Sequence, residues 1–314
     1  MGEFDLIKAY FTRPAHGGGV VLGVGDDCAL LQPEPGMQLA VTTDTLVSGI
    51  HFLPDDAPRD LGHKALAVNL SDLAAMGATP RWAFLNLTLP AVDEAWLAAF
   101  AEGLFALAER HSVRLAGGDT TRGPLSFGLT VMGEVPPGQA LLRSGARAGD
   151  LVCVSGVPGE AGAGLAHRLG RHLLPEGLAG RALQRLHRPE PRIELGLALR
   201  GLASGCIDIS DGLAQDLGHV LTSSGVGAAL DLACLPSSPV LDALPRDMAW
   251  RHQLTAGDDY ELLFTVPAAR AGLLAGLPTP VSVMGVVEAE PGLRLTAPDG
   301  QAFTLERKGH DHFI

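Results

Sequence analysis

The sequence predicts a two-domain α/β protein. Its 314 residues are more than a single hydrophobic core usually supports, and strand-like and helical segments alternate along the chain. The alternation is interrupted at Pro136-Pro137-Gly138, where proline and glycine end regular structure. We therefore expect an N-terminal domain over residues 1–138 and a C-terminal domain over residues 139–314.

The first half of the chain has a pattern rich in strands. In its longest expected helix, Leu61, Ala65 and Val68 follow helical spacing. Asp72 falls near the end of that helix, where a carboxylate opposes the helix dipole and needs a compensating cation. In chain order we expect a helix over Glu3–Phe11, strands around Ala29–Leu31 and Leu39–Val47, a helix over Asp60–Met76, a strand over Trp82–Leu89, a helix over Asp93–His111, and strands over Val113–Ala116 and Leu125–Val135.

The second half starts near Leu141 and alternates short strands with helices. The apolar run Leu151–Val154 leads into Gly156–Gly162, which lacks the Gly-x-Gly-x-x-Gly spacing of a dinucleotide site, so we expect an ordinary strand-to-helix turn. A P-loop is excluded, because none of the three lysines follows a glycine-rich loop. The helices expected in this half cover Gly162–Leu169, Arg192–Ala203 and Leu213–Ser223.

Composition and charge exclude several classes of function. A hydrophobic fraction of 46% and a charged fraction of 18% are typical of a globular protein. A net charge of -12 argues against nucleic-acid binding, which requires clustered basic residues. No apolar run reaches membrane length, and the N-terminus has no secretion signal pattern, so we expect a cytoplasmic protein. We also expect reduced thiols at the four widely spaced cysteines, Cys28, Cys153, Cys206 and Cys234.

Aspartates beside small or hydroxyl residues recur along the whole chain and are its most informative feature. Taken singly, such an aspartate is more often a turn or helix-cap residue. Turn chemistry needs one acid at a time, however, whereas Asp26-Asp27 and Asp258-Asp259 are doubled. Converging carboxylates repel one another unless cations join them, and hard oxygen ligands next to substrate phosphates suit Mg²⁺. The six segments are Gly25–Asp27, Thr42–Asp44, Ser71-Asp72, Gly117–Asp119, Asp208–Asp211 and Gly257–Asp259.

The same segments, with their neighbours, resemble the thiamine-monophosphate kinase family. The motifs occur in the family's order from Glu3 to Phe313. The segment Thr42–Phe52 selects this branch within a wider superfamily of ATP-using synthetases that includes aminoimidazole ribonucleotide synthetase. The segments that carry the resemblance are Gly25–Ala29, Thr42–Phe52, Asn69–Ala78, Gly117–Gly123, Arg143–Ala146, Asp208–Leu213 and Gly257–Leu262.

The resemblance implies a synthetase-like fold of the α/β (α+β) class. Its N-terminal domain would be β-rich, would bind ATP and Mg²⁺ and would pair with a second subunit to form a homodimer, and its C-terminal domain would be α/β. The implied reaction is direct in-line transfer of a phosphoryl group from ATP to thiamine monophosphate, the last step of thiamine diphosphate biosynthesis. ATP would be the co-substrate, and several Mg²⁺ ions the cofactors.

Roles for individual residues also follow from the resemblance. No general base is needed, because the attacking phosphate oxygen is already largely deprotonated at pH 7 and phosphoryl transfer depends mainly on positioning and charge neutralisation. The Mg²⁺ ligands would be Asp27, Thr42, Thr43, Asp44, Asp72, Asp119, Asp208 and Asp211. ATP would contact Gly118, Asp119, Arg143 and Ser210, and thiamine monophosphate would contact His51, Asp258 and His310.

Other interpretations stay open. Arg143 taken alone suits a surface arginine, and His51 suits a loop histidine. Relatives commonly carry Glu where this chain has Asp258 and often Tyr where it has His310, so both departures concern the substrate pocket. A sister enzyme that uses ATP to activate another small substrate is the second interpretation. A Mg²⁺-dependent protein that binds ATP without turnover is the third.

Overall fold

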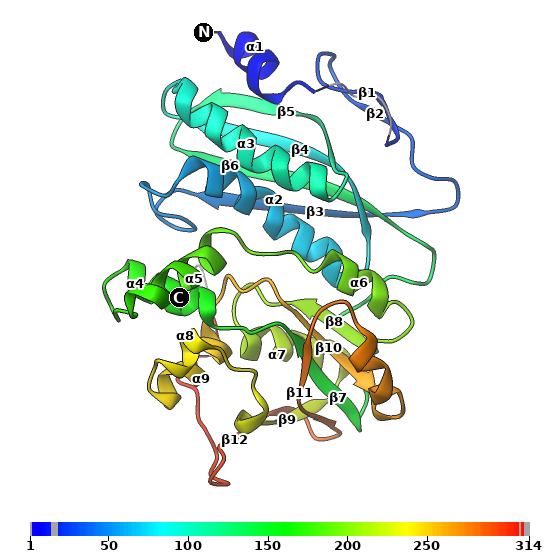
Figure 1. The fold of residues 1–314 in the computed structure, drawn as a ribbon. Coiled ribbons are helices and arrows are strands. Elements are labelled where there is room, and N and C mark those ends of the chain that lie inside the picture. Colours follow the sequence, from blue (N-terminus) through cyan, green and yellow to red (C-terminus); the bar gives the residue numbers. More distant parts are fainter. Residues whose placement is uncertain (1, 14–17, 308, 311–314) are drawn as a thin grey trace. The chain divides into compact units, whose positions relative to one another are not determined.

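The chain separates into two compact units in a computed structural model, which describes residues 2–13, 18–307 and 309–310 (Figure 1). Unit 1 comprises Met1–Leu73 and Ala78–Gly138, and unit 2 comprises Ala74–Gly77 and Gln139–Ile314. The roles that we expect of the two domains, in binding ATP and Mg²⁺ and in dimerisation, stay predictions.

Unit 1 is built on a four-stranded sheet with the order β3-β6-β4-β5. β6 pairs antiparallel with both β3 and β4, whereas β4 and β5 are parallel. The strands are β3 (Gln38–Val47), β4 (Thr79–Leu89), β5 (Arg114–Arg122) and β6 (Ser126–Val135). β3 and β5 are the edge strands of this sheet.

Two long helices, α2 (Pro58–Ala75) and α3 (Glu94–Arg110), pack on this sheet (Figure 1). They approach each other closely at Gly62 and Gly103, where a Cβ would overlap the backbone of the facing helix. The Phe127 ring from β6 contacts the Phe100 ring from α3 at 5.2 Å between centroids, in an edge-to-face arrangement. Aromatic packing therefore joins α3 to β6, and the close approach at the two glycines joins α2 to α3.

The N-terminal segment adds a short helical piece and a small hairpin to unit 1. Residues Glu3–Leu6 form α1 and Ile7–Phe11 continue it as the π-helical turn η1. β1 (Val20–Leu22) then pairs antiparallel with β2 (Leu30–Leu31), and the segment between these strands carries Asp26 and Asp27.

Unit 2 is built on a six-stranded sheet with the order β12-β9-β11-β7-β10-β8. Its strands are β7 (Asp150–Ser155), β8 (Gly205–Asp208), β9 (Gly227–Asp231), β10 (Leu262–Pro267), β11 (Val281–Glu288) and β12 (Gly292–Thr296). All neighbouring pairs are antiparallel except β9 and β12. β7 and β10 are largely buried, and their side chains share a core with Leu217 and Val220.

Helices of unit 2 follow or cover these strands. They are α4 (Glu160–Arg168), α5 (Glu176–His187), α6 (Ile193–Leu199), α7 (Leu213–Ser224), α8 (Pro239–Asp242) and α9 (Arg246–Thr255), with 3₁₀ turns η2 (Leu232–Cys234) and η3 (Ala268–Gly276). α7 starts just after β8, so the segment Asp208–Gly212 joins a strand end to a helix start. Such junctions carry many binding sites in α/β proteins.

The predicted fold class, α/β (α+β), is confirmed, and both large sheets are mixed. The strand expected over Val113–Ala116 was predicted too short: it runs on to Arg122, because pairing with β4 carries it through Gly117 and Gly118. The helices α5, α8 and α9 were not predicted. Among the described residues no helix is long and apolar enough to cross a membrane. All four cysteines are free thiols.

Candidate functional site

A pocket of about 1050 Å³ opens in unit 1. Phe4, Ile7 and Phe11 of the N-terminal helical segment contribute apolar lining. The lining is completed by the loop 23–29, by residues 84–86 of β4 and by residues 115–120 of β5. Apolar side chains, bare glycine backbone and carboxylates therefore share one concave surface, which suits a ligand with an aromatic ring and charged groups.

The floor of this pocket depends on glycine. Gly118 has a φ of +145°, and a Cβ at this position would overlap the Leu85 carbonyl oxygen of the neighbouring strand. Gly117 lies against the Phe84 ring. Because neither residue has a side chain, a ligand can approach the β5 backbone directly. The pocket thus brings together three residues predicted from the sequence, Asp27, Gly118 and Asp119.

A second group of predicted residues joins β3 to α2. The Thr42 hydroxyl donates a hydrogen bond to Asp72 Oδ2, and Asp44 forms a side-chain hydrogen bond with Asp72. Thr42 and Asp44 share one face of the strand because side chains alternate along it. Thr43 lies on the opposite face, where its Oγ1 accepts a hydrogen bond of 3.2 Å from Thr130. The Thr43 side chain is therefore not grouped with the two aspartates.

The electrostatics of this group favour the binding of a cation. The pKa of Asp44 is raised to about 7, mainly by burial and in addition by the negative charge of Asp72 and the hydrogen bond with Asp72. Asp72 also lies in the last turn of α2, at the negative end of the helix dipole. Two carboxylates with a neighbouring hydroxyl are hard oxygen donors, so these residues fit Mg²⁺.

The predicted metal ligands do not form one cluster. Among the described residues, no group of three or more His, Cys, Asp or Glu side chains could hold a metal ion. The structure instead divides seven of the eight ligands into Asp27 and Asp119 at the pocket, Thr42 with Asp44 and Asp72 between β3 and α2, and Asp208 and Asp211 at the end of β8 and just after it. The eighth ligand, Thr43, is hydrogen-bonded to Thr130 instead. Since Mg²⁺ usually takes one or two protein carboxylates plus water and phosphate oxygens, groups of this size are sufficient, and the metal stays a prediction.

The third group is shaped by a residue that the sequence analysis missed. Asp216, in the first turn of α7, accepts hydrogen bonds of 3.1, 3.2 and 3.1 Å from the backbone N–H groups of Ser210, Asp211 and Gly212. Burial and the charge of Asp211 raise the Asp216 pKa to about 7, although the three N–H donors oppose this shift. Its place near a helix start was the only sequence signal for this role.

Two predicted substrate residues are attached to the same segment. Asp258 donates from its backbone N–H to the Ser210 carbonyl at 2.9 Å, and His310 donates likewise to the Asp211 carbonyl at 2.9 Å. The Gln215 side chain donates to the His310 carbonyl at 2.9 Å. Unit 2 therefore brings together Ser210, Asp211, Asp258 and His310.

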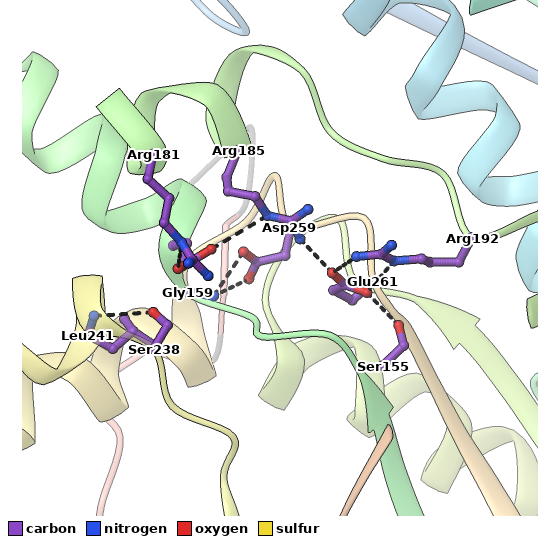
Figure 2. A network of polar contacts seen from close by, with 10 residues as sticks. Ser155, Gly159, Arg181, Arg185, Arg192, Ser238, Leu241, Asp259 and Glu261 are labelled. Atoms are coloured by element: carbon purple, nitrogen blue, oxygen red, sulfur yellow. Dashed lines mark hydrogen bonds and ion pairs between the residues drawn. The ribbon is translucent and has the colours of Figure 1, made fainter. Parts of the chain in front are cut away.

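A network of charged residues surrounds the buried carboxylates of Asp259 and Glu261 (Figure 2). Glu261 accepts hydrogen bonds from Arg185 of α5 and from Arg192 just before α6. The Asp259 carboxylate accepts from the backbone N–H of Gly159, at 2.8 Å to each oxygen. Sequence analysis missed this network because the partners of Glu261 and Asp259 lie 69 to 106 residues away from them along the chain.

Two predicted residues are not brought to these groups. Arg143 is exposed, and its backbone lies near Gly205, at the end of β8 opposite Asp208. His51 lies in the turn after β3, where its Nδ1 accepts a hydrogen bond of 3.0 Å from the Val47 N–H. This bond is consistent with the loop-histidine interpretation, and the ligand roles of both residues stay predictions.

Comparisons with known proteins cover nearly the whole chain. The family model of AIR synthase related proteins matches with its N-terminal domain over residues 25–135 and with its C-terminal domain over residues 147–298. The chain is 50% identical to the thiamine-monophosphate kinase of Escherichia coli K12, over 99% of this chain and 98% of that one.

Solved structures give the same picture. The chain superimposes on the thiamine-monophosphate kinase of Stenotrophomonas maltophilia with a TM-score of 0.88 and 44% identity, covering 96% of this chain and 98% of that one. It also matches AaThiL complexed with AMPPCP and TMP, with a TM-score of 0.78, 31% identity and coverage of 99% and 96%. The similarity therefore extends over both units.

Proposed function

This chain belongs to the thiamine-monophosphate kinases among the AIR synthase related proteins, and we propose that it phosphorylates thiamine monophosphate with ATP, giving thiamine diphosphate and ADP. The observation that carries this proposal is its likeness, over 99% of its length, to a protein complexed with AMPPCP and TMP. AMPPCP is an ATP analogue, and we take TMP to be thiamine monophosphate.

We propose that the pocket of unit 1 binds ATP. The apolar side chains of Phe4, Ile7 and Phe11 suit the adenine ring, and the bare backbone at Gly118 suits close approach of phosphates. Asp119 and Asp27 on the pocket wall would repel phosphates directly, so they are suited to contact through a cation. Arg143 and Ser210 remain further proposed ATP contacts.

We propose that Mg²⁺ is held by the three acidic groups, with Thr42 and Thr43 among the ligands carried over from the family. When bound, Mg²⁺ supplies charge neutralisation between two polyanions that water cannot screen in a closed site. Asp44 and Asp72 support this assignment, because they hold a partly protonated carboxylate pair at neutral pH without a cation. A carboxylate pair whose shared negative charge is neutralised when a cation replaces its proton is suited to a metal-dependent site.

We propose that Asp258 and His310 of unit 2 and His51 of unit 1 contact thiamine monophosphate. Asp258 offers a carboxylate to the cationic ring system, and His51 and His310 are the other proposed contacts. The attacking phosphate oxygen needs no general base at pH 7, because its second pKa is about 6. The protein's part is to hold this oxygen in line with the γ-phosphate and to exclude water.

Dimerisation and location are proposals of the same kind. β3 is an edge strand whose Leu39 and Val41 are exposed, and an unpaired edge of this kind is suited to pair with a second copy. A reaction that consumes ATP fits the cytoplasm.

The proposal is tested by incubating purified protein with Mg²⁺, ATP and thiamine monophosphate and separating the products by chromatography. We expect thiamine diphosphate and ADP to form in equal amounts. The control reactions replace thiamine monophosphate by thiamine, or omit Mg²⁺. ADP release that depends on a different small substrate would favour a sister enzyme, and ATP binding without any turnover would favour a binding protein; either result would contradict the proposal.

A further inference from the structure

The Glu261 side chain is fully buried, and its carboxylate accepts hydrogen bonds from several donors (Figure 2). Arg192 donates from Nε to Oε2 at 2.7 Å, and from Nη2 to Oε1 at 2.5 Å. Arg185 donates to Oε1 at 2.5 Å, and the Ser155 hydroxyl donates to Oε2 at 2.5 Å. Two guanidinium groups and a hydroxyl together fix the position and orientation of this buried carboxylate.

Backbone hydrogen bonds also hold Glu261 and the residues before it. Its carbonyl oxygen accepts from the Ile209 N–H at 2.9 Å, and the Tyr260 N–H donates to the Ile209 carbonyl at 2.8 Å. Asp259, only 3% exposed, is anchored to the Gly159 N–H. Hydrogen bonds therefore hold the loop from Gly257 to Glu261 against the segment that carries Ser210 and Asp211.

Between these anchors the backbone takes an unfavourable conformation twice. Asp258 has a φ of +67° and Tyr260 a φ of +49°, values that residues other than glycine rarely adopt. Such conformations persist only where the surrounding contacts impose them, and they cluster at ligand-binding positions. In this loop their result is specific: the Tyr260 hydroxyl donates to Asp258 Oδ1 at 3.1 Å.

We propose that Tyr260 is a positioning residue for Asp258, and that the buried Glu261–Arg185–Arg192 network holds the loop in the backbone conformation which makes this contact. The proposal rests on the proposed function, because Asp258 is taken there to face the cationic ring of the substrate. With Oδ1 occupied by the Tyr260 hydroxyl, the carboxylate has one orientation in which to meet that cation. Tyr260 would thereby determine specificity for the thiamine moiety without touching ATP.

A double-mutant cycle tests this relationship. Asp258→Ala, Tyr260→Phe and the double variant are compared with the wild type by measuring kcat and both Michaelis constants. The net contribution of a typical hydrogen bond corresponds to about two- to ten-fold in affinity. We expect Tyr260→Phe to raise KM for thiamine monophosphate by about that factor and to leave KM for ATP unchanged. In the Asp258→Ala background, the loss of the hydroxyl should have no further effect.

Two matched controls address general structural effects. Tyr10→Phe removes the hydroxyl of the other tyrosine of the chain. Arg181→Gln breaks an arginine–glutamate pair of the same network, to Glu160, that does not include Glu261. Both should leave the two Michaelis constants unchanged. Glu261→Gln should raise KM for thiamine monophosphate and lower the melting temperature, and Tyr260→Phe, which removes a single oxygen atom, supplies the test if Glu261→Gln fails to fold.

The outcomes separate this inference from the function on which it rests. If the wild type does not phosphorylate thiamine monophosphate, the proposed function fails and the inference fails with it. If the wild type is active but the effects of Tyr260→Phe and Asp258→Ala multiply, or Tyr260→Phe changes KM for ATP as much as KM for thiamine monophosphate, only the inference is overturned.

Discussion

Thr42 on β3 donates a hydrogen bond from its hydroxyl to Asp72 Oδ2 in the last turn of α2. The contact joins residues 30 positions apart and holds Asp72 beside Asp44 on the adjacent strand face. Carboxylates so close repel one another when both are ionised, and burial increases this cost. The pair is therefore destabilising in the absence of a cation at neutral pH, and it is suited to bind one.

Asp44→Asn should nearly abolish turnover while it stabilises the metal-free protein. The substitution removes one charge of the pair and keeps a side chain of the same size. A pKa raised from 3.8 to about 7 corresponds to a gain on the order of a few kcal/mol at pH 8. Urea unfolding in EDTA and an activity assay at limiting Mg²⁺ measure the two effects. Wild-type activity in this variant at limiting Mg²⁺ would contradict the assignment of Asp44 to the metal.

The stabilising effect of Asp44→Asn should depend on pH. The folded protein holds the Asp44 proton up to about pH 7, whereas the unfolded chain releases it near pH 3.8. The ionisation of Asp44 therefore lowers the free energy of unfolding as pH rises between these values, and the loss is complete above about pH 7. We expect the variant to gain much more over the wild type at pH 8 than at pH 5. An equal gain at both values would show that burial and Asp72 do not raise this pKa.

ATP should bind weakly without divalent ions. Three acidic residues, Asp26, Asp27 and Asp119, line the pocket of unit 1, and they repel the ATP phosphates unless a cation intervenes. Calorimetric titration with ATP in EDTA and in Mg²⁺ measures the difference. Asp119→Asn should reduce the dependence on Mg²⁺. Undiminished affinity in EDTA would rule out phosphate binding through a metal.

Gly118→Ala should destroy the pocket floor. Its φ of +145° is unfavourable for alanine, and the new Cβ would overlap the Leu85 carbonyl. We expect a loss of about 2 kcal/mol or more in the free energy of unfolding, together with loss of ATP binding. Gly180→Ala is the matched control, because this exposed residue of α5 has open space at its Cβ. It should stabilise the protein by up to about 1 kcal/mol, and a stable Gly118→Ala protein that binds ATP normally would exclude the proposed role of β5.

Asp258→Asn should weaken substrate binding with little effect on stability. Asparagine tolerates the left-handed backbone at this position and can still accept the Tyr260 hydrogen bond, so only the charge is lost. A charge-assisted contact is worth about 1.5–3 kcal/mol, which corresponds to about ten-fold or more in KM for thiamine monophosphate. If Asp258 only stabilises its turn, Asp258→Asn should leave both Michaelis constants and the melting temperature unchanged, whereas Asp258→Ala, which removes the acceptor of the Tyr260 hydrogen bond, should lower the melting temperature.

The part of the site that was predictable from the sequence consists of residues whose signal is local. Asp27, Gly118 and Asp119 were found because each belongs to a short motif, and the pocket brings these three together. Thr42 and Asp44 were found in the same way, and strand alternation alone would have separated Thr43 from them. The extent of β5 was mispredicted, because glycines disfavour a strand locally while pairing with β4 supports it.

The sequence by itself determined the fold class, most helices, most strands of the first half, and the family, because apolar periodicity and short motifs act over a few residues. Only the tertiary structure decided that Asp72 lies against Thr42, that Asp216 holds the backbone of Ser210–Gly212, and that Glu261 is bound by Arg185 and Arg192. Buried polar groups must find partners wherever the fold brings a donor, at any separation along the chain. That pairing depends on how helices and strands pack, and no local pattern records it.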